Sequence, residues 1–111
     1  MFKDDEYYLN LDLQAASIKI NQLGNKRGNA DAGIFGDAIK SIVFRCERGE
    51  TFSTEFLKEI LGEPDRIKKD ELPERWEYDW EGYHGPDKYS SYTPLIIENG
   101  MCKGIDMRDR E

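Results

Sequence analysis

The chain has 111 residues, of which 38% are hydrophobic and 35% are charged, and its formal net charge at pH 7 is −7. This length predicts a single domain over residues 1–111, and no stretch approaches the roughly 18 consecutive apolar residues that a membrane-spanning helix needs. The negative charge argues against binding nucleic acid, because a surface that neutralises phosphates needs clustered Lys and Arg, and it suits a basic protein partner.

The first 23 residues show the short alternation that is typical of strands. The stretch YYLNLDL alternates three leucines with polar residues, and SIKINQLG spaces two isoleucines in the same way. A strand is therefore expected in each stretch, with a helix over residues 14–23 as the alternative for the second. The start, MFKDDEYYLN, is acidic where a secretory signal is basic and then apolar, so we expect a cytoplasmic protein.

From Gly24 to Asp37 the chain contains four glycines and two asparagines without any periodicity, which predicts a long loop. The next stretch, KSIVFRCE, places alternate apolar residues on one face of an expected strand. Its cysteine, Cys46, and the second cysteine, Cys102, both lie in apolar alternating runs. Two such cysteines give neither a disulfide framework nor a zinc-binding spacing, so we interpret both as buried thiols.

The clearest helix is predicted over residues 53–61. Ser53 is a good N-cap, and Phe52 before it is spaced to meet Leu57 as a hydrophobic staple. Gly62 suits the left-handed position after the last turn, and Pro64 prevents continuation. The apolar stripe of this helix comprises Phe56, Leu57, Ile60 and Leu61. A helix of about two turns is too short to be stable alone, so we expect it to pack on a sheet.

The segment WEYDWE predicts a strand with two different faces. Trp76, Tyr78 and Trp80 are two residues apart and therefore project from one side, which we expect to pack on the helix. The other side is expected to be an open face of the sheet, and its acids are Glu77, Asp79 and Glu81. On such a face, reversing the charges is expected to have little effect on stability.

The last expected element is a hairpin in YTPLIIENGMCKGIDM, with Asn99 and Gly100 as its turn signal. A two-residue loop would place Ile97 opposite Cys102. A three-residue loop over residues 98–100, with Gly100 left-handed in a bulge, gathers more apolar residues on one face, so we prefer it. Those residues are Leu95, Ile97, Met101, Ile105 and Met107. Lys103 is the one misfit, and it must extend toward the sheet edge.

From Gly49 onward the chain has a capped short helix ending in LGEPD, a strand with WEYDW and a closing hairpin with an Asn-Gly turn. The residues that carry this pattern are Leu61, Gly62, Pro64, Trp76, Tyr78, Asn99 and Gly100. In this second half the chain resembles the small module of the SmpA/OmlA outer-membrane-assembly lipoproteins, a fold theme shared with the β-lactamase inhibitory proteins. The resemblance implies an interaction module, in which helices cover one face of an antiparallel sheet and the other face binds protein.

The aromatic strand is predicted to end at Gly82, and the loop after it holds the only histidine, His84. A nucleophilic Cys–His pair would have to join this loop to a thiol on an apolar strand face, which we do not expect. The glycines before Asp37 lack the spacing of a phosphate-binding loop or a dinucleotide site. Acids on an open sheet face lack the cleft that sets two carboxyl pKa values apart, so no enzyme activity, cofactor or metal site is expected.

The expected fold is α+β, an antiparallel sheet with one or two short helices packed on one face. The expected function is that of a cytoplasmic immunity or inhibitor protein, which binds a basic partner such as a bacterial toxin. A structural or assembly subunit of the lipoprotein type is the alternative, and a small enzyme or ligand carrier is the third possibility. The predicted partner-binding residues are Glu77, Asp79, Glu81, Tyr83, His84, Asp87 and Tyr89.

Overall fold

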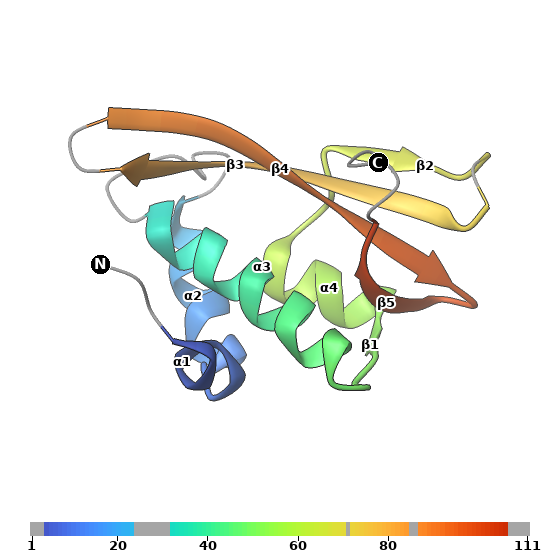
Figure 1. Cartoon of the computed structure of the whole chain (residues 1–111). Helices are drawn as coiled ribbons and strands as arrows, with labels where there is room; N and C mark the ends of the chain where they lie inside the picture. Colours follow the sequence, from blue (N-terminus) through green and yellow to red (C-terminus); the bar gives the residue numbers. More distant parts are fainter. Residues whose placement is uncertain (1–3, 24–31, 71, 85–86, 107–111) are drawn as a thin grey trace.

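The computed structural model describes residues 4–23, 32–70, 72–84 and 87–106. Within these ranges an antiparallel five-stranded sheet lies on a layer of four helices (Figure 1). The elements are α1 (Asp5–Leu9), α2 (Leu13–Leu23), α3 (Ala32–Glu47), β1 (Phe52–Ser53), α4 (Thr54–Leu61), β2 (Arg66–Lys68), β3 (Glu74–His84), β4 (Asp87–Glu98) and β5 (Met101–Ile105). The strand order is β1-β5-β4-β3-β2. The α+β class and the antiparallel sheet are therefore confirmed. No helix in the described ranges is both long and apolar enough to cross a membrane.

The first half of the chain is helical, which corrects the strands expected in YYLNLDL and KSIVFRCE. The first stretch lies in α1 and at the start of α2, and the second lies in α3. For residues 14–23 the helical alternative is right. Residues 32–37 of the expected long loop belong to α3, and residues 24–31 lie outside the described part of the chain.

These helices form because apolar residues recur every three or four positions. Ile20 of α2 is only 3% exposed, whereas Ile18, which a strand would place on the same face, is 62% exposed. Asp4 caps α1 by accepting a hydrogen bond from the amide of Tyr7 at 3.0 Å. In α3 the helical spacing is complete, and the buried hydrophobic residues are Phe35, Ala38, Ile39, Ile42, Val43 and Cys46.

Helix α4 has the predicted boundaries. The Ser53 hydroxyl accepts from the amide of Phe56 at 3.0 Å, and Gly62 ends the helix with a φ of 83°. The ring of Phe52 stacks on Phe56, with centroids 5.4 Å apart. The fully buried residues of the helix are Leu57, Ile60 and Leu61. The predicted stripe therefore packs under the sheet.

The aromatic side of β3 faces the helices, as predicted. Trp76, Tyr78 and Trp80 are 5%, 0% and 8% exposed. The Tyr78 hydroxyl donates to the carbonyl of Gly62 at 2.9 Å, and the Trp80 indole N–H donates to the Thr93 hydroxyl at 3.0 Å. Each of these two rings thus satisfies its polar atom inside the core.

The two cysteines are free and buried, which confirms the interpretation of both as buried thiols. Cys46 lies on α3 rather than on a strand, and its Sγ contacts the carbonyl oxygen of Cys102 at 3.7 Å. The hydrogen-bonding contact with Cys102 and burial raise the pKa of the Cys46 thiol above its ordinary value.

The closing hairpin has a two-residue turn, so the predicted three-residue loop is wrong. Glu98 pairs directly with Met101, while Asn99 and Gly100 have φ angles of 53° and 74°. The left-handed conformation of Gly100 is confirmed. The turn is of the type in which both central residues are left-handed, and its twist matches that of the flanking strands.

The bulge of this hairpin lies farther along, at Lys103. Leu95 pairs with Ile105, and Ile97 pairs with Cys102, so β5 has one more residue than β4 between these pairs. Cys102 and Ile105 therefore both face the core, and Lys103 is exposed. Met101, the partner of Glu98, is on the opposite face from the expected one, and Met107 lies outside the described residues.

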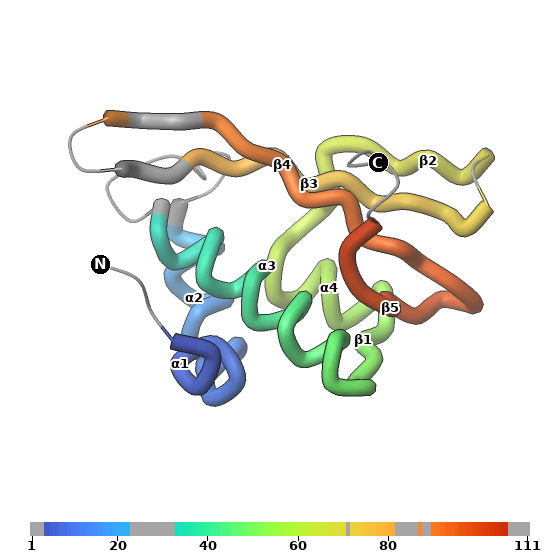
Figure 2. Tube along the Cα trace, viewed as in Figure 1, coloured from blue at the N-terminus to red at the C-terminus, as the bar shows by residue number. Residues whose placement is uncertain are grey.

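The central hairpin extends well beyond its neighbours (Figure 2). β3 pairs with β4 over its whole length, from Glu74 opposite Ile97 to His84 opposite Asp87. The strand does not end at Gly82 as expected. β2 pairs only with residues 75–77 of β3, and β5 pairs only with residues 95–98 of β4. The remainder is a two-stranded ribbon, which we call the β3–β4 ribbon (residues 78–84 and 87–94).

Candidate functional site

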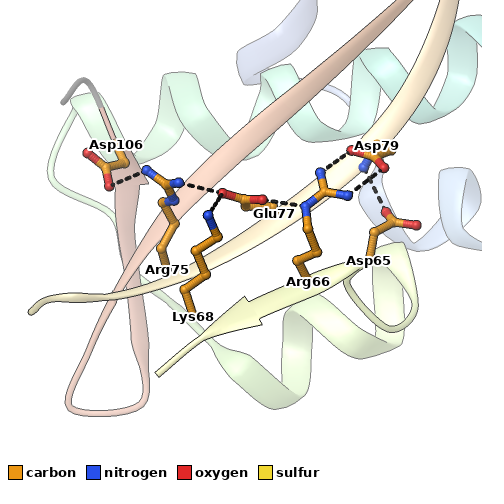
Figure 3. A network of polar contacts seen from close by, with 7 residues as sticks. All are labelled: Asp65, Arg66, Lys68, Arg75, Glu77, Asp79 and Asp106. Atoms are coloured by element: carbon orange, nitrogen blue, oxygen red, sulfur yellow. Dashed lines mark hydrogen bonds and ion pairs between the residues drawn. The ribbon is translucent and has the colours of Figure 1, made fainter. Parts of the chain in front are cut away.

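The sheet face that points away from the helices carries a cluster of charged side chains (Figure 3). β2 and β3 are antiparallel, with Arg66 opposite Glu77 and Lys68 opposite Arg75, so these four side chains share one face. Asp65 precedes β2, Asp79 lies farther along β3, and Asp106 follows β5. We call these seven residues the open-face network: Asp65, Arg66, Lys68, Arg75, Glu77, Asp79 and Asp106.

Glu77 is the centre of the open-face network and is only 3% exposed. Its Oε1 accepts from Arg66 Nε at 2.5 Å, its Oε2 accepts from Arg75 Nη2 at 2.6 Å, and Lys68 Nζ lies 3.6 Å from Oε2. Burial alone would raise the pKa of this carboxyl. The hydrogen bonds from Arg66 and Arg75, with the charges of Arg75 and Lys68, outweigh burial and hold the pKa below its ordinary value.

Arg66 joins Glu77 to the next acid along β3. Its two Nη atoms hold the carboxylate of Asp79 in a fork, with distances of 2.5 and 2.9 Å. Hydrogen bonds to Asp79 and Glu77 raise the pKa of Arg66 further above its ordinary value. Asp65 fixes the start of β2, because its Oδ2 accepts from the Asp79 amide at 2.7 Å and its own amide donates to the Glu77 carbonyl at 2.9 Å.

Arg75 extends the open-face network across the sheet to the end of β5. Its Nη1 lies 3.6 Å from Oδ2 of Asp106, and these two residues are 6% and 1% exposed. The Asp106 amide donates to the carbonyl of Pro94 at 2.8 Å, which anchors the chain after β5 beside β4. Charged groups on one face thus tie the consecutive strands β2 and β3 to the end of β5, which is distant in sequence.

The charged groups of the open-face network pair mainly with one another, so few of them are available to act on a substrate. Its four acids face three bases, so it carries one of the seven net negative charges. The carboxylates of Glu77 and Asp79 are engaged by guanidinium groups. Within the described ranges, no group of three or more His, Cys, Asp or Glu side chains is placed to hold a metal ion.

The structure places the predicted partner-binding residues along β3 and β4, with Glu77 beside β2 and the other six in the β3–β4 ribbon. Glu77, Asp79 and Glu81 share the outer face, as expected from their spacing. Glu77 is buried, which corrects the expectation that its charge can be reversed with little effect on stability. The side chain of Asp79 is 48% exposed, and Glu81 is partly exposed.

The remaining four predicted residues lie near the far end of the β3–β4 ribbon. They belong to strands rather than to the expected loop, with Tyr83 opposite Lys88 and His84 opposite Asp87. Tyr89 is opposite Gly82. Asp87 is exposed, and the side chains of the two tyrosines and the histidine lie outside the described part of the structure. Backbone pairing therefore brings all seven predicted residues onto one hairpin.

Sequence reasoning suggested Arg75 as a counter-charge for these acids but did not identify Arg66 and Lys68. Arg66 and Lys68 are two residues apart in DRIK, which is the alternation of a short strand with a basic face. That signal, read together with the acidic face of β3, could have suggested the pairing. A comparison with protein-family models, curated proteins and solved structures gives no match for this chain, so the resemblance to the SmpA/OmlA module stays a prediction.

Proposed function

We propose that this protein is a non-enzymatic binding module, a cytoplasmic inhibitor or immunity-type protein that neutralises a basic protein partner such as a bacterial toxin. The observation that carries the proposal is the β3–β4 ribbon, which extends past β2 and β5 with acids on its surface. The four helices of the described ranges all lie on the other face of the sheet (Figure 1). The ribbon thus offers acids on both of its faces to a partner, with Glu81 on the outer face and Asp87 near the far end on the opposite face.

Charge supports the same proposal. The open-face network is nearly neutral, so most of the net charge of −7 lies on other residues of the chain. Of the surface acids on the ribbon, Glu81 and Asp87 lie outside the network. Acidic surfaces accelerate association with basic partners and disfavour acidic ones. The network itself serves as the rigid base of the ribbon, because it ties β2, β3 and the end of β5 together.

The test begins with a pull-down from the native host and mass spectrometry of the proteins that co-purify. Association rates with the captured partner are then measured by stopped-flow fluorescence for the ribbon variant Glu81→Lys/Asp87→Lys. The control is Glu55→Lys/Glu59→Lys, which makes the same change of charge on exposed positions of α4. Urea unfolding of both variants checks that they are folded.

At low salt we expect the ribbon variant to associate about three- to tenfold more slowly than the control, and high salt should remove most of the difference. Equal association rates for the two variants would show that the ribbon acids take no part in the encounter. A captured partner that is itself acidic would contradict the proposed class of partner.

A further inference from the structure

A groove of about 280 Å³ lies on the helix side of the sheet, between α3 and the edge of β4. Ile39 and Val43 of α3, Trp80 of β3 and Ile105 of β5 line its apolar floor. Its lining also includes the exposed Lys40 and three residues of β4 with hydroxyl groups, Ser91, Tyr92 and Thr93. The groove thus has a mainly apolar lining that includes one cation and three hydroxyl-bearing side chains.

The groove exists because β5 is shorter than β4. β5 ends at Ile105, opposite Leu95, whereas β4 continues to Asp87. In the described ranges no strand pairs with residues 87–93 of β4 on this side. The groove therefore lies where a strand in line with β5 would continue. Thr93 is buried and faces the core as Leu95 does, so a residue opposite Thr93 on an added strand would project into the groove.

The sequence of this edge favours strand addition. Residues 89–93 read YSSYT, in which the two tyrosines and the threonine favour strands and no residue is charged or proline. Natural proteins usually protect such edges with charged residues, proline or bulges. Here the bulge is at Lys103 of β5, and the protective residues of β4, Lys88 and Pro94, flank residues 89–93 and leave that stretch itself regular.

Lys40 gives the groove a preference for charge. Its Nζ lies 5.6 Å from the centroid of the Trp80 ring, and it forms no ion pair with any residue of the described ranges. An ammonium group at the mouth of an apolar groove attracts a carboxylate that is bound beside it. Residues two apart on a strand share a face, so that carboxylate belongs two positions from the residue in the groove.

We propose that the β4 edge and this groove bind an extended acidic peptide segment of a partner protein. The segment adds to β4 as an antiparallel strand and inserts an aromatic or branched aliphatic side chain opposite Thr93. An Asp or Glu two positions away contacts Lys40. This surface is on the other side of the sheet from Glu77, Asp79 and Glu81, whereas Asp87, which pairs with His84, is on the same side as the groove. The two proposals are distinguished by their variants, because Lys40→Met leaves every acid of the proposed toxin-binding surface unchanged.

The test is a selection from a phage-displayed random peptide library against the full chain. Enriched peptides are synthesised with amidated C-termini and a fluorescent label, and their dissociation constants are measured by anisotropy. The two key variants are Lys40→Met and the matched control Lys58→Met. Lys58 also lies 5.6 Å from a tryptophan ring, that of Trp76, but it pairs with Glu63 and does not line the groove.

We expect the enriched peptides to share an apolar residue and an acid two positions apart. Lys40→Met should weaken binding by about three- to tenfold, while Lys58→Met should leave it unchanged. Amide chemical shifts of residues 90–93 and 39–44 should change on binding, and those of β2 should not. The proposal is overturned if no peptide is enriched, if the two lysine variants bind alike, or if the shifts map elsewhere.

Discussion

Helix α3 contains two glycines that the structure places in opposite surroundings. A Cβ on Gly36 would lie 2.9 Å from Cζ3 and 3.2 Å from Cε3 of Trp80, whereas a Cβ on Gly33 meets nothing within 4 Å. Trp80 is thus seated directly against the backbone of α3. Replacing each glycine by alanine therefore tests whether the indole ring occupies this position.

The difference between the two variants can be worked out from these contacts. Alanine is about 1 kcal/mol more favourable than glycine inside a helix and less so near an end. Both variants therefore gain some stability from helix propensity. Carbon atoms pack at about 3.5–4.0 Å, so at Gly36 the ring must move by roughly half an ångström or more. The ring is buried and held by its hydrogen bond to Thr93. Overpacking of this kind costs about 1–3 kcal/mol.

We therefore expect Gly33→Ala to be more stable than Gly36→Ala by about 1–3 kcal/mol, because most of the gain in helix propensity cancels between them. Urea unfolding followed by circular dichroism measures the difference directly. Thermal unfolding gives a second reading, at about 4 °C for each kcal/mol in a domain of this size. If Gly36→Ala proves as stable as Gly33→Ala, Trp80 does not pack on α3 as described.

The other predictions concern the open-face network and the cap of α4. Glu77→Gln should lower the free energy of unfolding by roughly 2–4 kcal/mol, since it leaves the buried Arg75 with a weakened counter-charge, while the exposed control Glu98→Gln should change it by less than about 0.5 kcal/mol; similar urea midpoints for the two would contradict the burial of Glu77. Because the pKa of Glu77 is lowered in the folded state, its ionic contribution is present above the unfolded pKa of about 4.3 and is lost as the pH falls through the lower folded pKa. The urea midpoints of wild type and Glu77→Gln should therefore converge in acid, and a constant gap between them would refute this reasoning. Ser53→Ala should cost about 1 kcal/mol in urea unfolding through loss of the bond to the Phe56 amide, and an unchanged midpoint would mean that the cap contributes nothing.

The elements that could be predicted are those whose signals are local. Helix α4 has its cap, its apolar stripe and its stop within twelve residues of sequence, Ser53 to Pro64, and β3 alternates large aromatics with acids over a long run. The first half failed because a short alternation such as YYLNLDL fits both a strand and one side of a helix. Longer spacing, such as that from Phe35 to Cys46, settles the question, but it crosses the stretch that was interpreted as a loop.

The sequence predicted which strand face carries the acids of the candidate site, but not that one of them is buried among bases. Spacing alone places Glu77 on the outer face of its strand. Its burial depends on Arg66 and Arg75, and on the register that sets β2 against β3, which sequence patterns do not fix. The hairpin register was missed for a similar reason. A bulge at Lys103 changes which residues of β5 share a face, and no residue type in β5 predicts this bulge.

The strand order also determines how the two edge strands of this sheet can unfold. β1 and β2 are the two edge strands, yet only α4 and a few residues separate them in the chain. With strands about 4.8 Å apart, the edges of five strands are about 19 Å from each other, while a helix of eight residues spans about 12 Å. The segment from β1 to β2 therefore crosses under the sheet from one edge to the other, and its length is only slightly greater than the distance that it spans. Loss of one edge would pull on the other, so amide hydrogen exchange at the two edges should occur in one cooperative event rather than by independent fraying.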